Sequence, residues 1–329
     1  MAVFTEVDPS EADALTQRLG LGPLRSLEGI AAGIENTNYF VGTDGGRWVL
    51  TLFERMDDAR LQFCLGLMKH LAGDGLPVPE PVAAADGALC HQVAGKPAAL
   101  VRRLDGDHIE APDLHHAAAV GQMLARLHLS AQRYTGLQPN PRGLAWCATT
   151  AAAVDHALNE GQRGLLRSEV VWQQALTATP AHAALPRAAM HGDLFRDNVL
   201  FAGLPGRERL SGCFDFYFAG VEALAWDLAV VLNDWALDDA TGALDADRAD
   251  TLTQAYQTVR PLQSGEIRLL PALLRAAALR FWVSRLADLH LPREAALLNP
   301  KDPGHFERVL RSRIAQPWHP QPVAEVPWA

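Results

Sequence analysis

The run HGDLFRDNVLF (191–201) combines residue types that could carry out phosphoryl transfer. Asp193 is followed five residues later by Asn198, and Asp215 comes after them in the run CFDFYF (213–218). A kinase needs a carboxylate beside the attacking hydroxyl and oxygen ligands for Mg²⁺ on the ATP phosphates, and protein kinases supply them in this order. The spacing alone also fits an Asp- and Asn-rich surface loop. The apolar residues after Asn198 and the later Asp215 favour a catalytic site.

A segment with glycine and short polar side chains precedes the first predicted β-hairpin. Its residues 33–38 read GIENTN, and β-rich runs at 39–41 and 48–53 flank an Asp-Gly turn. Backbone amides and small residues in such a place could lie against nucleotide phosphates, although an ordinary turn explains the spacing equally well. The candidate ATP contacts in this segment are Gly33, Asn36, Thr37 and Asn38.

The elements that would position these residues fall into two groups. Residues 1–104 are rich in strands, with one main helix predicted over 58–72. Residues 105–329 are mostly helical, with helices predicted from Pro112 to about residue 131 and over 266–290. The pattern predicts an α+β fold with a small antiparallel-sheet N-lobe (1–104) and a larger, mainly helical C-lobe (105–329). Two short β-like runs are expected around the motif, within 188–220.

Three charged residues in the C-terminal half are candidates for other roles. Asp227 begins a helical run, and a helix cap or a carboxylate that holds the 191–198 loop is the favoured interpretation. Asp234 could meet a substrate ammonium group or belong to a polar helix face. Arg285 continues the apolar stripe of helix 266–290, so it either pairs with Asp288 or binds a substrate carboxylate, for which Arg280 is a second candidate.

The composition excludes several classes of protein. The chain has 329 residues, is 49% hydrophobic and has a formal net charge of −9, which argues against binding nucleic acid or a membrane surface. Its four cysteines are far apart and form no paired metal motif. No apolar run reaches membrane-spanning length and the N-terminus lacks an apolar signal segment, so a cytoplasmic protein with small-molecule partners is expected. The oligomeric state is not encoded in any pattern that we recognise.

Several runs together resemble a known family. GIENTNYFV (33–41), GLPVPEPV (75–82), HGDLFRDNVLF (191–201), DLAVVLNDW (227–235) and RFWVSRL (280–286) are similar to the bacterial homoserine kinases of the aminoglycoside-phosphotransferase and choline-kinase-like group. The resemblance extends from near the N-terminus to about residue 310. It implies a protein-kinase-like two-lobed fold, with ATP and Mg²⁺ as cofactors and L-homoserine as the substrate, in threonine biosynthesis.

The resemblance also implies roles for individual residues. Asp193 would be the catalytic base, and Asn198 and Asp215 the Mg²⁺ ligands. His191 would pack and hydrogen-bond beneath the catalytic loop, and Arg196 is a candidate for phosphate or substrate charge. Tyr217, in the run DFYFA (215–219), joins Asp234 and Arg285 as a candidate for substrate contact.

One departure from the general kinase pattern leaves other functions open. The N-lobe lysine that touches the phosphates should lie near Thr51, and its glutamate partner near Arg60 or Gln62. Thr51 is therefore placed at the ATP site without a cation of its own. The alternatives are a kinase for choline, ethanolamine, an aminoglycoside or a sugar, and a pseudokinase that binds nucleotide without turnover.

Overall fold

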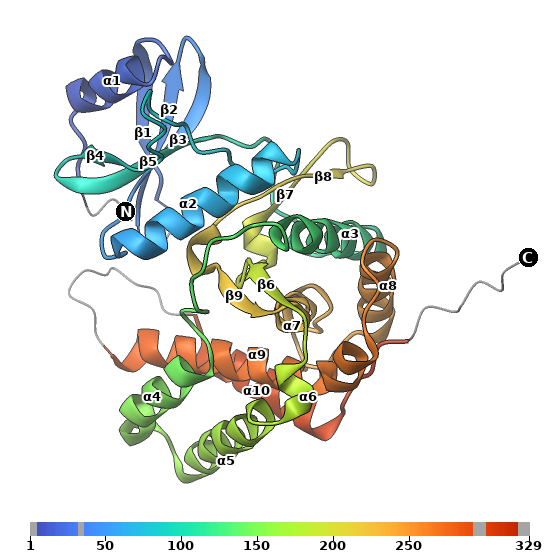
Figure 1. Ribbon diagram of the computed structural model, residues 1–329. Coiled ribbons are helices and arrows are strands. Elements are labelled where there is room, and N and C mark those ends of the chain that lie inside the picture. Colours follow the sequence, from blue (N-terminus) through green and yellow to red (C-terminus); the bar gives the residue numbers. More distant parts are fainter. Residues whose placement is uncertain (1–4, 32–35, 292–300, 322–329) are drawn as a thin grey trace, which may run out of the picture.

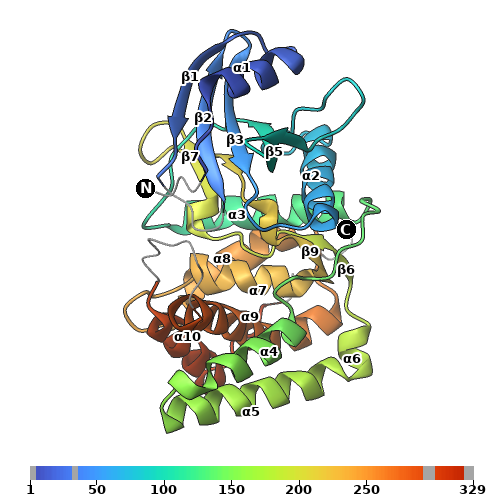
Figure 2. The same cartoon turned by 90° about the vertical axis from the view of Figure 1, so that its left-hand side faces the viewer.

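The computed structural model describes residues 5–31, 36–291 and 301–321 (Figure 1). A five-stranded antiparallel sheet with strand order β1-β2-β3-β5-β4 forms one end of the molecule. Helices α1 and α2 pack beside it, and the remaining helices form the other end (Figure 2). The predicted α+β arrangement is thereby confirmed. The elements of the first part are α1 (Pro9–Arg18), β1 (Leu24–Gly29), β2 (Thr37–Thr43), β3 (Gly46–Leu52), α2 (Asp58–Gly73), β4 (His91–Val93) and β5 (Lys96–Arg102).

The hairpin of β2 and β3 confirms the turn predicted from the Asp-Gly pair. Its register pairs Thr43 with Gly46 at the turn and Asn38 with Thr51 near the open end. Alternate residues of β2 are buried because successive side chains of a strand point to opposite faces. The sheet ends at Arg102, and we propose the boundary between the lobes just after it, at 104–105.

The second part contains eight α-helices among its described residues, with two small β-ladders among them. Both ladders are antiparallel, and together they carry the 191–198 loop. The elements are α3 (Leu114–Ala131), α4 (Leu144–Val154), η1 (Asp155–Ala157), α5 (Glu160–Thr177), α6 (Pro180–Ala183), β6 (Arg187–Met190), η2 (Arg196–Asn198), β7 (Val199–Ala202), β8 (Arg209–Cys213), η3 (Phe216–Phe218), β9 (Gly220–Ala223), α7 (Leu224–Trp235), α8 (Ala246–Gln257), α9 (Ser264–His290) and α10 (Pro303–Ala315).

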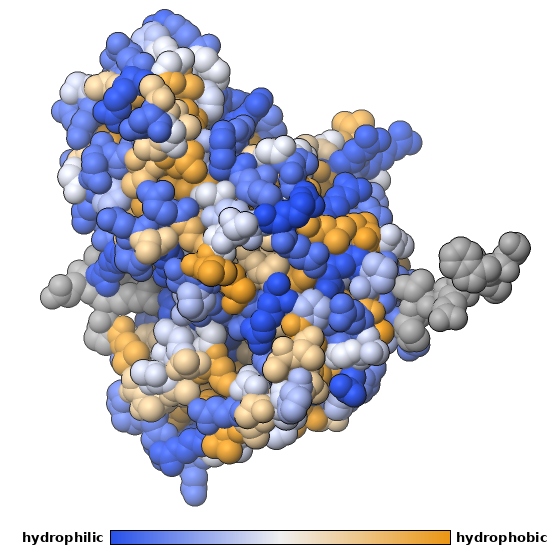
Figure 3. All heavy atoms as spheres, viewed as in Figure 1, coloured by the Kyte–Doolittle hydropathy of each residue, from blue (hydrophilic) through white to orange (hydrophobic). Residues whose placement is uncertain are grey.

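Helix α7 is the centre of this helical part, since every one of its residues is buried. A helix that is buried on all sides must be covered completely by other elements. Polar residues in α7, such as Asp227 and Asp234, are therefore held at defined positions. On the face shown in Figure 3, hydrophobic side chains form separate patches among hydrophilic ones. No helix in the described residues is long and apolar enough to cross a membrane.

Candidate active site

The loop that follows β6 is fixed by a glycine. Strand β6 ends at Met190, which pairs with Gly220 of β9. Gly192 then has a φ of +79°, and a Cβ built on it would lie 2.9 Å from the backbone oxygen of Phe218. A larger residue at 192 would be strained and would also collide with backbone. The glycine of the HGD run is therefore needed for the chain to turn toward Asp193.

Asp227 holds this loop from below, as the sequence interpretation favoured. Its carboxylate accepts hydrogen bonds from the backbone N–H groups of His191 (3.0 Å) and Gly192 (2.8 Å). The ring nitrogen Nε2 of His128 lies 3.2 Å from the same group. Burial alone would raise the pKa of Asp227, but the hydrogen bond and electrostatic attraction of His128, together with the N–H group of Gly192, lower it. Asp227 is thus a structural carboxylate, and His128 is a buried core residue.

Asp227→Ala should lower the free energy of unfolding by about 3 kcal/mol, because it leaves two buried N–H groups and a buried imidazole without their acceptor. Urea unfolding followed by circular dichroism measures this change. The exposed Glu28 of β1, replaced by Ala, is the matched control and should shift stability by less than about 0.5 kcal/mol. Equal stability of the two variants would contradict the anchoring role.

His191 connects the two β-ladders. Its Nε2 lies 2.8 Å from the carbonyl oxygen of Phe214, and its Nδ1 accepts a hydrogen bond from the N–H of Asp193 at 3.2 Å. Because Nδ1 accepts, Nε2 carries the proton and donates. Burial lowers the pKa of His191, which favours this neutral form. These contacts are those expected of a residue that supports the loop.

Asp193 lies at the surface of the loop and contacts Arg280, which the sequence pattern favours less than Arg285 as a functional arginine. Nη1 of Arg280, on α9, donates to Oδ1 of Asp193 at 3.1 Å. The Asp193 side chain is 18% exposed and that of Arg280 only 3% exposed. The carboxylate can therefore be reached from outside while one of its oxygens is fixed. This geometry suits a group that receives a proton from a bound hydroxyl.

Asn198 and Asp215 come together because they lie at the same end of the β7–β8 hairpin. Val199 pairs with Cys213, so the residues just before β7 and just after β8 are neighbours. The N–H of Phe214 donates to the carbonyl of Asn198 at 3.0 Å. The side-chain amide of Asn198 donates to the carbonyl of Asp193 at 2.7 Å, which leaves its carbonyl oxygen as a possible metal ligand. Among the described residues no three His, Cys, Asp or Glu side chains cluster as a metal site, so phosphate oxygens would have to complete the coordination.

The β-like run predicted over 213–218 is only partly a strand. Strand β8 ends at Cys213, and Asp215 adopts the left-handed conformation with φ 64° and ψ 57°. Residues 216–218 then form the short 3-10 helix η3. A non-glycine residue in this conformation is uncommon, and such residues are concentrated at functional sites. The alternation of aromatic residues resembles a strand in sequence, but each ring packs in a different place.

The predicted ATP contacts on β2 and β3 are held by hydrogen bonds within the sheet. Thr51, at the position predicted for the kinase lysine, donates to Oδ1 of Asn38 at 2.7 Å, and its hydroxyl lies near that of Tyr217. The hydroxyl of Thr37 donates to Glu54 at 2.8 Å. Asn36 is buried beside these residues, whereas Gly33 lies outside the described residues.

Tyr217 therefore lies on the sheet side of the site. Its ring meets that of Phe53 edge to face at 4.9 Å, and burial raises the pKa of its hydroxyl. Arg60, near the position predicted for the kinase glutamate, donates to the backbone carbonyl of Tyr217. Helix α2 thus contacts the η3 segment through the guanidinium group of Arg60.

Arg196 and Asp234 hold each other. The backbone N–H of Arg196 donates to Oδ2 of Asp234 at 2.7 Å, and its guanidinium also meets Asp234 at 3.3 Å and Asp239 at 3.1 Å. Burial tends to lower the pKa of Arg196, but these two carboxylates raise it. Asp234 is buried rather than part of a solvated face. The pair fastens the η2 turn to the end of α7, and the geometry offers no unpaired charge on either residue for a ligand.

Arg285 also makes contacts within the protein. Its Nη1 donates to the carbonyl of Asp302 at 3.0 Å, and its guanidinium lies 4.5 Å from the ring centroid of Phe306. Burial lowers the pKa of Arg285. Arg285 therefore joins α9 to the start of α10. The residue of α9 that reaches Asp193 is Arg280, about one and a half turns earlier in the helix.

A carboxylate beside an exposed loop, with an amide and a second carboxylate on an adjoining hairpin, defines a phosphotransferase with a kinase-like two-lobed fold. The phosphotransferase enzyme family matches residues 26–262, and the chain belongs to that family. Two similar curated proteins are named homoserine kinase. The one from Polaromonas naphthalenivorans (strain CJ2) is 54% identical over 97% of this chain and 99% of the relative. The one from Burkholderia ambifaria (strain MC40-6) is 50% identical over 96% of both chains.

Solved structures share the fold at low sequence identity. The amicoumacin kinase hAmiN, in complex with AMP-PNP, Ca²⁺ and Ami, has a TM-score of 0.67 at 15% identity and covers 92% of this chain and 91% of its own. A choline kinase from Cryptosporidium parvum Iowa II has a TM-score of 0.63 at 11% identity and covers 94% and 96%. The predicted kinase-like fold is thus confirmed.

Proposed function

We propose that the protein transfers the γ-phosphoryl group of ATP to the side-chain hydroxyl of L-homoserine, which yields O-phospho-L-homoserine for threonine biosynthesis. The observation that carries this proposal is the identity of 54% with a curated homoserine kinase over nearly the whole of both chains. Asp193, Asn198 and Asp215 supply the groups that phosphoryl transfer requires.

Asp193 orients the acceptor hydroxyl and receives its proton. An alcohol is a very weak acid, so the proton leaves late, as the phosphoryl group moves through a loose transition state. One oxygen of Asp193 is held by Arg280, which leaves the other for the hydroxyl. Asn198 and Asp215 would hold Mg²⁺, which would neutralise charge on the β- and γ-phosphates. Much of the rate enhancement then arises from positioning and electrostatics.

The remaining predicted residues support this arrangement. His191 and Asp227 shape the catalytic loop, and Arg196 with Asp234 fixes the η2 turn that carries Asn198. For Arg196 we propose a positioning role in place of direct contact with phosphate. We propose that residues around Thr51 receive ATP from the sheet side. The four cysteines are free thiols, which supports a reducing, cytoplasmic location.

Coupled ADP release over a panel of acceptors tests the function. With Mg·ATP, L-homoserine should have a kcat/KM at least about 100-fold above that of choline, ethanolamine or an aminoglycoside, because these acceptors lack the carboxylate that a site for an amino acid must bind. Mass analysis should find one phosphate on the acceptor. Faster turnover of choline than of L-homoserine would show that choline is the better substrate. Nucleotide binding without transfer to any acceptor would indicate a pseudokinase.

A further inference from the structure

Three arginines from separate parts of the chain surround the ring of Phe218. The guanidinium carbons of Arg60, Arg142 and Arg280 lie 5.6, 5.2 and 5.1 Å from its centroid. Because Arg280 also contacts Asp193, this positive charge is concentrated beside the proposed site of phosphoryl transfer. In a chain with a net charge of −9, such a local concentration of cations indicates that anionic groups bind there.

Arg280 has one side of its guanidinium group without a hydrogen-bond partner in the described part of the chain. Nη1 is taken by Asp193, and the group lies 3.8 Å from the ring centroid of Phe281. Nε is buried and has no acceptor. A buried N–H without an acceptor is costly and rare, so it calls for a partner that the protein itself does not provide. Nε and Nη2 together form the fork that binds carboxylates in a bidentate manner.

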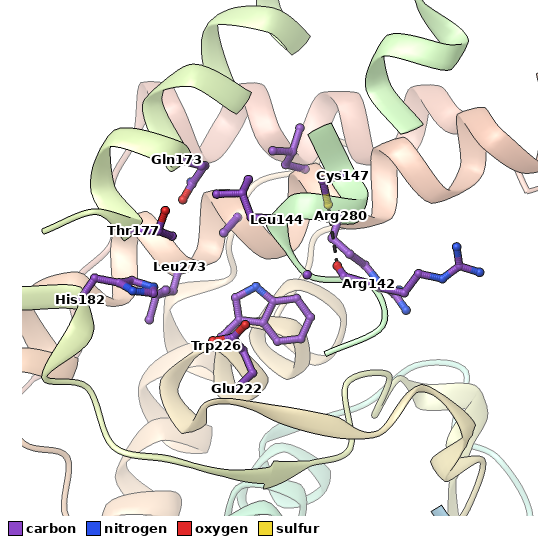
Figure 4. Close-up of a pocket in the computed structure, with 13 residues that line it drawn as sticks. Arg142, Leu144, Cys147, Gln173, Thr177, His182, Glu222, Trp226, Leu273 and Arg280 are labelled. Carbon is purple, nitrogen blue, oxygen red and sulfur yellow. Dashed lines mark hydrogen bonds between the residues drawn. The ribbon is translucent and has the colours of Figure 1, made fainter. Parts of the chain in front are cut away.

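A cavity lies next to this group. Its walls come from α4, α5, α6, α7, α9 and β9; it opens to solvent, and its volume is about 50 Å³. In Figure 4, Arg280 lies on one side of the cavity and His182 on the other, with the indole of Trp226 between them. Trp226 is 7% exposed and, with Cys147, gives this wall an apolar character. A small anionic group, such as a carboxylate, fits such a cavity.

We propose that Arg280 binds the α-carboxylate of the acceptor through Nε and Nη2 while Nη1 holds Asp193. This inference rests on the proposed function, since it concerns an amino-acid acceptor. One planar group would then touch both the base and the substrate, so that binding the carboxylate places the hydroxyl at Asp193. The positive charge of Arg142 adds to the attraction. An acceptor without a carboxylate leaves the fork unpaired and is disfavoured for that reason.

The test compares two acceptors with two forms of the enzyme. L-homoserine amide keeps the hydroxyl and the ammonium group of L-homoserine but lacks the carboxylate. The unmodified enzyme should prefer L-homoserine in kcat/KM by about 100-fold, as expected for a buried charged hydrogen-bonded pair. In Arg280→Gln this preference should fall to about one. The substitution can also disturb Asp193, but that loss of kcat/KM is the same for both acceptors and cancels in their ratio. The preference should change mainly through KM.

Two further variants complete the experiment. Arg280→Lys keeps the charge without the fork and should show an intermediate preference. Arg268→Gln, at an exposed position of the same helix, should keep the full preference. Binding of a fluorescent ATP analogue reports that each variant is folded.

The results separate this inference from the proposed function. If Arg280→Gln slows both acceptors equally and the preference stays near 100-fold, Arg280 acts only through Asp193 and the inference is wrong. If the unmodified enzyme phosphorylates no L-homoserine, the proposed function fails first, and this inference fails with it.

Discussion

Asp193→Asn is expected to lower kcat by about 1,000-fold, which is the usual contribution of a general base. The amide has nearly the shape of the carboxylate and keeps an oxygen that can accept the hydrogen bond from Nη1 of Arg280. It cannot take up the proton of the acceptor hydroxyl. The backbone of the loop is held by Asp227 and His191, so the substitution should leave its conformation unchanged.

The measurement is steady-state kinetics with saturating ATP and L-homoserine, together with ATP affinity by fluorescence. Affinity for Mg·ATP should change by less than about 3-fold, because Asp193 is expected to act on the acceptor. Asp197→Asn is the matched control, since Asp197 lies in the same loop and pairs with Lys301 at an exposed position. Turnover within about 5-fold of the unmodified enzyme would show that another group serves as the base.

The arrangement of the 191–198 loop could be predicted because its residues are close together in sequence. Asp193 and Asn198 are five residues apart, and the β-rich run after them makes the hairpin that brings Asp215 near. The sequence also indicates the type of role that Asp227 has, a carboxylate at the start of a helix that holds the 191–198 loop. Its partners could not be named, because they depend on how α3, β6 and α7 pack.

Arg280 and Arg60 show where prediction from sequence was limited. On helix 266–290, both Arg280 and Arg285 lie near the apolar stripe, and periodicity favoured Arg285. The side chain that meets Asp193 is decided by the angle at which α9 packs against the loop, and the stacking of Phe195 on Phe281 at 4.3 Å fixes that approach. The sequence pattern marks Arg60 only as a position near which kinases carry a glutamate, and it does not predict that the guanidinium reaches the carbonyl of Tyr217.

The left-handed conformation of Asp215 was likewise hidden from sequence reasoning. A run of alternating aromatic residues has high β-propensity, so it predicts a strand through 213–218. Tertiary contacts override this preference. Phe216 is buried and meets the ring of His191 at 4.5 Å, while Tyr217 packs on the sheet side and Phe218 faces the arginines.

Asp215→Asn is expected to lower kcat at least about 100-fold and to raise the Mg²⁺ concentration needed for half-maximal rate. Asn tolerates the left-handed conformation better than other residues, so the change removes a negative charge and little else. Hard divalent cations prefer charged oxygen ligands. After the substitution, the protein would offer Mg²⁺ only two neutral amide oxygens, those of Asn198 and of the new asparagine.

Titration of the rate with Mg²⁺ and with Mn²⁺ at saturating substrates separates metal binding from turnover. Mn²⁺ tolerates nitrogen and neutral ligands more readily, so it should restore a larger share of the rate than Mg²⁺ does. Asp105→Asn, at an exposed position where Asp105 pairs with Arg47, is the matched control and should retain the metal dependence of the unmodified enzyme. An unchanged Mg²⁺ requirement in Asp215→Asn, with normal turnover, would remove Asp215 from the metal site. Asn198 alone could not bind Mg²⁺ tightly, so the nucleotide phosphates and residues on the sheet side would have to hold the cation.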